Sequence, residues 1–113
     1  MEELQELLNE IKQKKLLVLV EGIKDKNALE KLGIKNILTI KKPLYAVVEE
    51  IESKTKEVVL LTDLDAEGKK LYHRLAKDLQ AHKVKINNKL REFLFTTGLK
   101  HIEGLATYLS NLE

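Results

Sequence analysis

Two unbroken apolar runs that each stop at acidic side chains constrain this sequence more than any other feature. Leu16–Val20 ends at Glu21, and Val58–Leu61 is followed by Thr62 and Asp63. Short apolar runs without polar alternation are typical of strands buried on both faces of a parallel sheet. Because ligands bind outside the carboxyl ends of such strands, we expect the carboxylates to gather at one edge. Carboxylates gathered without a cation would repel one another, so a divalent-metal site is indicated.

Helical patterns alternate with strand-like runs along the whole chain. The first helix is predicted from an apolar stripe on one of its faces, at Leu4, Leu7, Leu8 and Ile11. The later helices are predicted over residues 24–32, 43–51, 66–81, 89–95 and 103–112, and the strands over 16–20, 36–40, 57–61 and 84–86. Gly33 is placed to end the second helix, and Pro43 is expected in the first turn of the third. The pattern predicts an α/β fold of three layers, α/β/α, with a four-stranded parallel sheet and its first and third strands adjacent.

Length and composition limit the class of protein. A chain of 113 residues is expected to form one domain, and 43% hydrophobic with 34% charged residues is typical of a folded globular protein. The absence of cysteine excludes disulfides and thiolate zinc sites. The apolar runs are far shorter than the ~20 residues that span a bilayer. With an acidic N-terminus, this predicts a cytoplasmic protein without a membrane partner.

The histidines and the charge distribution carry weaker information. His73, His82 and His101 lack the spacing of metal ligands and are expected at surface or half-buried positions. The net charge is only +2, but the basic excess is concentrated between Lys69 and Arg91, after the second acidic motif. This distribution suits a polyanionic partner, although an ordinary solvated helix face is the competing explanation.

The second acidic motif places two aspartates on one side of an extended segment. Asp63 and Asp65 are two residues apart, so their side chains are expected to face the same cavity. Asp65 is also placed to cap the helix that follows, which explains one aspartate but not both. Gly68 leaves the first helical turn open to a phosphate, or is needed for local packing.

The first acidic motif has a carboxylate in a costly position. Glu21 follows five apolar residues and must be solvated, paired or bound to a metal. Gly22 is expected to permit a tight turn from strand to helix. Asp25 lies where the next helix starts, and a negative charge is favourable there.

The combination Glu21-Gly22-x-x-Asp25 with Asp63-x-Asp65-x-x-Gly68 resembles the Toprim domain over residues 16–86. That Rossmann-like domain occurs in topoisomerases of types IA and II, bacterial primases, OLD-type nucleases, recombination mediator proteins and a ribosomal-RNA maturation ribonuclease. The length is similar to that of the small stand-alone Toprim proteins of archaea and some bacteria. The resemblance implies one Toprim domain over 1–113, with an N-terminal helix at 1–14 and a helical tail at 88–113.

The resemblance also implies roles for the motif residues. Glu21 would be the general acid or base of phosphodiester chemistry, and Asp63 and Asp65, together with Glu21, would hold Mg²⁺ or Mn²⁺. The implied partner is RNA or DNA, with a protein partner or a homodimer also expected. Contacts to phosphate or nucleic acid are expected from Gly22, Lys24, Asp25, Gly68, Lys69, Lys70, Arg74 and Arg91.

In the tail, Arg91 and Ile102-Glu103-Gly104 would be the counterparts of recurring family features, an arginine after the fourth strand and a Val-Glu-Asp/His stretch. Gly104 departs from that pattern, and Asn87 or Asn88 stands where an acid is expected.

Other classes fit less well. A receiver domain needs an acidic pair after the first strand and a fifth strand, and a haloacid-dehalogenase-type phosphatase has its Asp-x-Asp after the first strand. The stronger alternative to a small Mg²⁺-dependent nuclease or RNA-processing protein is a Toprim module that binds nucleic acid or a partner protein without turnover.

Overall fold

The computed structural model describes residues 2–112, and its elements follow the predicted alternation. The strands are β1 Leu17–Val20, β2 Ile37–Thr39, β3 Glu57–Leu61 and β4 Lys85–Asn87. The helices are α1 Glu2–Lys14, α2 Ile23–Lys31, α3 Leu44–Lys54, α4 Ala66–Ala81, α5 Lys89–Leu94 and α6 Leu105–Leu112, with a 3₁₀ turn, η1, at Ile102–Gly104. Met1 and Glu113, the ends of the predicted domain, lie outside the described residues.

The four strands form one parallel sheet in the order β2-β1-β3-β4. The predicted α/β fold, the parallel sheet and the adjacency of the first and third strands are therefore confirmed. Val20, the last residue of β1, pairs with Leu61, the last residue of β3. Because these strands end at the same level, the acidic residues that follow them leave the sheet side by side.

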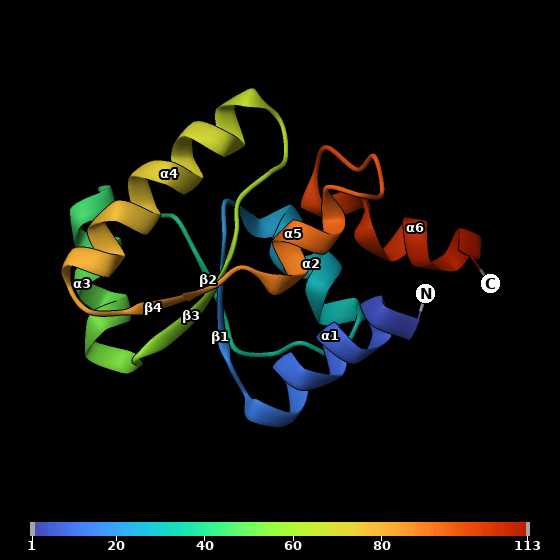
Figure 1. The fold of residues 1–113 in the computed structure, drawn as a ribbon, viewed down its shortest axis with the longest axis horizontal. Coiled ribbons are helices and arrows are strands. Elements are labelled where there is room, and N and C mark those ends of the chain that lie inside the picture. The colour runs from blue at the N-terminus through green and yellow to red at the C-terminus, as the bar shows by residue number, and fades with distance from the viewer. Residues whose placement is uncertain (1, 113) are drawn as a thin grey trace.

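Helices cover both faces of the sheet, as Figure 1 shows. Alternate residues of β1 point to opposite faces, Leu17 and Leu19 to one and Val18 and Val20 to the other. The first face packs against α3 and α4 with a cluster of ten buried residues: Leu17, Leu19, Val47, Val48, Ile51, Val58, Leu60, Leu75, Leu79 and Val84. The second face packs against α1, α2, α5 and α6, and its cluster includes Leu4, Leu8 and Ile11 from the predicted stripe of α1.

Local chemistry explains where several elements begin and end. Gly33 has a φ of +90° directly after the C-cap of α2, the left-handed conformation predicted for it. Pro43 is the N-cap of α3, with an extended ψ of 148°, and not part of its first turn as predicted. The predicted last helix is in fact divided into η1 and α6. No helix within residues 2–112 is long and apolar enough to cross a membrane.

Candidate metal centre

Glu21 and Asp63 meet at the carboxyl edge of the sheet. The register that pairs Val20 with Leu61 places the residues after β1 beside those after β3. The Asp63 backbone N–H donates a hydrogen bond of 2.7 Å to Glu21 Oε2. The two acidic motifs, 42 positions apart in the sequence, are therefore in direct contact.

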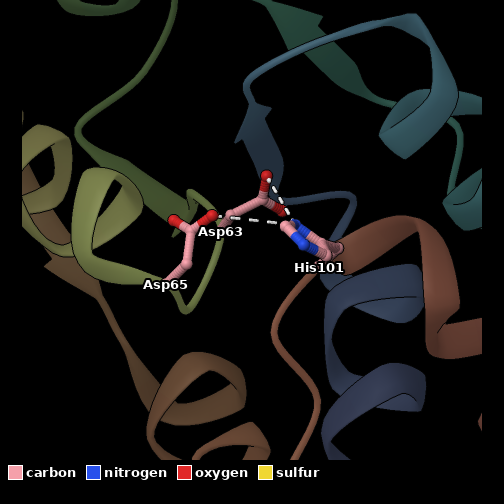
Figure 2. A group of neighbouring side chains, drawn as sticks. All are labelled: Asp63, Asp65 and His101. Atoms are coloured by element: carbon pink, nitrogen blue, oxygen red, sulfur yellow. Dashed lines mark ion pairs between the residues drawn. The ribbon is translucent and has the colours of Figure 1, made fainter.

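Asp63 and Asp65 also converge, and His101 joins them (Figure 2). One potential ligand atom from each of these residues lies within 4.8 Å of the others. His101 Nδ1 is 3.5 Å from Asp63 Oδ2 and 3.8 Å from Asp65 Oδ2. Two carboxylates and an imidazole are a donor set that divalent metals accept.

The tail carries His101 to this position through backbone hydrogen bonds on both sides of it. Lys100 O accepts the N–H of Leu64 at 2.8 Å, and Ile102 N–H donates to Asp63 Oδ1 at 2.9 Å. His101 is exposed, as expected, and so are His73 and His82. The proximity of His101 to the aspartates is not predicted by the sequence, because no local spacing relates this histidine to residues of the second acidic motif.

Gly68 is required by packing. A Cβ at this position would lie 1.9 Å from the Asp63 carbonyl oxygen, which excludes every other residue without movement of the backbone. Its N–H donates to Asp65 Oδ1 at 2.8 Å, the capping interaction predicted for that aspartate. Thr62 Oγ1 donates to the Gly68 carbonyl at 2.7 Å. The Gly68 amide is buried and already paired with Asp65, so its N–H is not left for the phosphate contact expected from the sequence.

The first motif also differs from expectation. Gly22 has an extended backbone with φ −149°, and a Cβ there would meet no atom within 4 Å, so the turn does not need glycine. Its N–H donates to Asp25 Oδ2 at 3.1 Å and is not left for a phosphate. Asp25 is buried, with 7% of its surface exposed, and acts as a cap of α2. Direct nucleic-acid contacts by Gly22 and Asp25 are therefore not supported.

Arg91 lies inside the protein and not on the surface that was expected to meet nucleic acid. Only 2% of it is exposed. Its guanidinium donates hydrogen bonds to the carbonyls of Thr62 and Asp63. It lies 4.6 Å from the ring centre of Tyr72 and 5.2 Å from that of Phe95. These contacts stabilise the conformation of the loop that carries the aspartates, so Arg91 acts on the site from the protein interior.

Burial and neighbouring charge perturb two of the acids. Desolvation raises the pKa of Glu21 above its usual 4.5, the hydrogen bond from Asp63 opposes this shift, and the charges of Asp63, Asp25 and Asp65 add to it. Desolvation likewise raises the pKa of Asp25, opposed by the hydrogen bond from Gly22. Perturbed acids of this kind cluster at functional sites.

A shallow pocket of about 410 Å³ opens over these groups. Its lining comes from the first motif, the Asp63 loop and the tail: Glu21, Gly22, Ile23, Lys24, Asp25, Asp63, His101 and Glu103. Lys24 is exposed at this rim. Lys69, Lys70 and Arg74 are exposed on α4, which starts directly after Asp65, and Lys69 Nζ lies 5.5 Å from the Phe95 ring centre.

Comparisons with known proteins relate this chain to one family and to proteins of solved structure. The family model of the Toprim domain matches residues 15–88. A UPF0292 protein of Methanocaldococcus jannaschii is 34% identical, over 96% of this chain and 91% of the relative. An Aquifex aeolicus protein of solved structure superposes with a TM-score of 0.80 at 33% identity, over 88% of this chain and 94% of that one. The zinc-binding and RNA polymerase domains of the Aquifex aeolicus primase superpose with a TM-score of 0.59 at 23% identity, over 92% of this chain and 27% of that one. This last likeness shows the fold alone.

The position of Arg91 predicts a large stability effect. Arg91→Met keeps an apolar stem but leaves the carbonyls of Thr62 and Asp63 without their charged donor, at a cost of about 1.5–3 kcal/mol in the free energy of unfolding. Urea denaturation measures this loss. Arg74→Met, the same change on the exposed face of α4, is the control and should cost much less. Equal losses in the two variants would contradict the supporting role of Arg91.

The raised pKa of Glu21 predicts a pH-dependent gain in stability for Glu21→Gln. The folded state binds this proton more tightly than the unfolded state, so the contribution of Glu21 to stability falls as pH rises from about 4.5 through the raised pKa. Glutamine keeps the acceptor for the Asp63 N–H and removes the charge. In the presence of a chelator, the variant should melt at a higher temperature than wild type at pH 7, and the difference should shrink below pH 4.5. Glu49→Gln, at an exposed position, should show no such trend.

Proposed function

Because this chain belongs to the Toprim-domain family, and to the UPF0292 proteins among its relatives, we propose that it carries out metal-dependent phosphodiester chemistry on nucleic acid. The specific activity proposed is that of a small nuclease or RNA-processing protein that uses Mg²⁺ or Mn²⁺.

This proposal rests on the convergence of the two acidic motifs at the carboxyl ends of β1 and β3. Glu21 contacts the Asp63 backbone, and Asp63 and Asp65 each have one carboxylate oxygen directed toward His101. The donor set fits a divalent cation, since carboxylate oxygens are the ligands that Mg²⁺ prefers and that Mn²⁺ also accepts. Asp63 and Asp65 would hold the ion, with Glu21 beside them. When bound, such an ion polarises a phosphoryl oxygen and offsets the charge that develops on it.

Glu21 is proposed as the proton-transfer group. Its pKa is raised by desolvation, which brings the carboxyl closer to the range in which an acid can both accept and release a proton near neutral pH. Its Oε2 is oriented by the N–H of Asp63, so the carboxyl group is held in place at the edge of the pocket.

The exposed cations near the site support a polyanionic substrate. Lys70 and Arg74 are four residues apart on α4 and share one of its exposed faces. Lys69 lies on the first turns of the same helix, and Lys24 lies at the rim of the pocket. Such side chains contact the phosphate backbone and not the base edges, which favours a substrate recognised by charge and shape.

The proposed chemistry predicts that Glu21→Gln abolishes cleavage and spares binding. Incubation of wild-type protein with structured RNAs and with single- and double-stranded DNAs, with Mg²⁺ or Mn²⁺ and with a chelator, should give metal-dependent products. Glu21→Gln should lower the rate at least about 100-fold because it removes the proton-transfer group and keeps the shape. Glu67→Gln, an exposed acid in the first turn of α4, is the matched control and should retain activity. Binding without cleavage by wild type would favour the non-catalytic module.

The proposed substrate contact predicts a change in salt dependence. Lys70→Ala with Arg74→Ala should lower the slope of log affinity against log salt by roughly one to two units, because each cation releases about one counterion from the nucleic acid. Lys35→Ala with Lys56→Ala removes two exposed cations that precede β2 and β3, at the opposite edge of the sheet, and should leave the slope unchanged. Equal slopes for both double variants would place the nucleic acid elsewhere.

A further inference from the structure

His101 lies beside the aspartates although its sequence context gives no reason for it. In each aspartate one oxygen is already engaged by the backbone: Asp63 Oδ1 accepts the Ile102 N–H, and Asp65 Oδ1 accepts the Gly68 N–H. The other oxygen of each, Oδ2, faces His101 Nδ1 at 3.5 and 3.8 Å (Figure 2). The atoms directed toward the imidazole are thus the carboxylate oxygens that these hydrogen bonds leave for a ligand.

The two distances from His101 suit an ion that the imidazole shares with each aspartate. Metal–ligand bonds to nitrogen or oxygen are about 2.0–2.2 Å, so two ligand atoms of one ion lie at most about 4.4 Å apart. Both measured separations from His101 Nδ1 are below that limit. The backbone on both sides of His101 is also held in place, because Lys100 and Ile102 are hydrogen-bonded to Leu64 and Asp63.

We propose that His101 is the third protein ligand of the metal at Asp63 and Asp65, and that it makes the site prefer a first-row transition-metal dication such as Mn²⁺ or Co²⁺ to Mg²⁺. This inference rests on the metal-dependent function proposed above. Its physical basis is ligand softness, since Mg²⁺ takes oxygen ligands and keeps its waters, whereas transition metals bind imidazole nitrogen more strongly.

A simple ion pair is the competing explanation, and it predicts the opposite result. A protonated His101 paired with the aspartates would compete with any metal for the same carboxylate oxygens. Its removal would then leave affinity unchanged or raise it for every cation. A histidine ligand, in contrast, loses affinity on removal, and selectively for metals that favour nitrogen.

The experiment measures metal binding and not activity. Calorimetry with Mg²⁺, Mn²⁺ and Co²⁺ alone is performed on wild type and on His101→Ala, with folding checked by circular dichroism. Wild type should bind Co²⁺ and Mn²⁺ more tightly than Mg²⁺. His101→Ala should weaken Co²⁺ binding at least about tenfold and change Mg²⁺ binding less than about twofold. Unchanged or increased Co²⁺ affinity would overturn the proposal.

Two further measurements complete the test. His82→Ala removes another exposed histidine that pairs with a carboxylate, at 3.1 Å from Glu52, and should leave all affinities as in wild type. Pulsed EPR of Mn²⁺ bound to wild-type protein should detect a directly coordinated nitrogen, independently of how any variant folds. A nitrogen-free spectrum, with binding that still requires Asp63 and Asp65, would reject His101 as a ligand and leave the proposed function standing. If no cation binds in a manner sensitive to Asp63→Asn with Asp65→Asn, both proposals fail.

Discussion

The backbone and side chain of Asp63 together connect the parts of the candidate site. Its N–H binds Glu21 after β1, its carbonyl accepts a hydrogen bond from Arg91 on α5, and its Oδ1 accepts the N–H of Ile102 from the tail. Gly68, in the first turn of α4, packs closely against the same carbonyl. One residue therefore sets the relative positions of four segments, and a shift of its backbone would move every group of the site.

Burial of charge at this edge is tolerated because opposite charges and hydrogen bonds lie close by. Desolvation and mutual repulsion raise the pKa of Glu21 and Asp25. The folded protein therefore retains part of the unfavourable electrostatic free energy of placing these carboxylates together. The buried guanidinium of Arg91 lies on the interior side of the loop and contacts the rings of Tyr72 and Phe95. Burial lowers the pKa of Arg91, whereas Tyr72, Glu92 and then Glu21 and Asp63 oppose this shift and favour the charged form. A bound dication would offset the remaining repulsion from the solvent side.

The basic residues near the site have two different roles, a structural one and a surface one, which the composition does not distinguish. Arg91 is buried and organises the loop, whereas Lys69, Lys70 and Arg74 are exposed on α4. The first kind of cation acts on the geometry of the acids, and the second is available to a polyanion. Membership of the Toprim-domain family associates the acidic residues after β1 and β3 with a metal-dependent, nucleic-acid-related function. The C-terminal tail adds the imidazole of His101 to these residues.

The sequence by itself determined the fold class, the parallel four-stranded sheet, the order of the elements with most boundaries correct to about one residue, the cap formed by Asp65 and the convergence of the acidic motifs. These features follow from local periodicity and from the fact that parallel strands share a carboxyl edge. Only the tertiary structure decided the rest. The burial of Arg91 and the approach of His101 depend on contacts between segments that are distant in sequence. The backbone contact that requires Gly68 and the occupied amide of Gly22 are local, but they depend on the exact path of the backbone, which residue type and spacing do not specify. Residue type and spacing predict which side chains share one face of a helix or strand. Contacts between separate elements depend instead on how their side chains pack in the space between them.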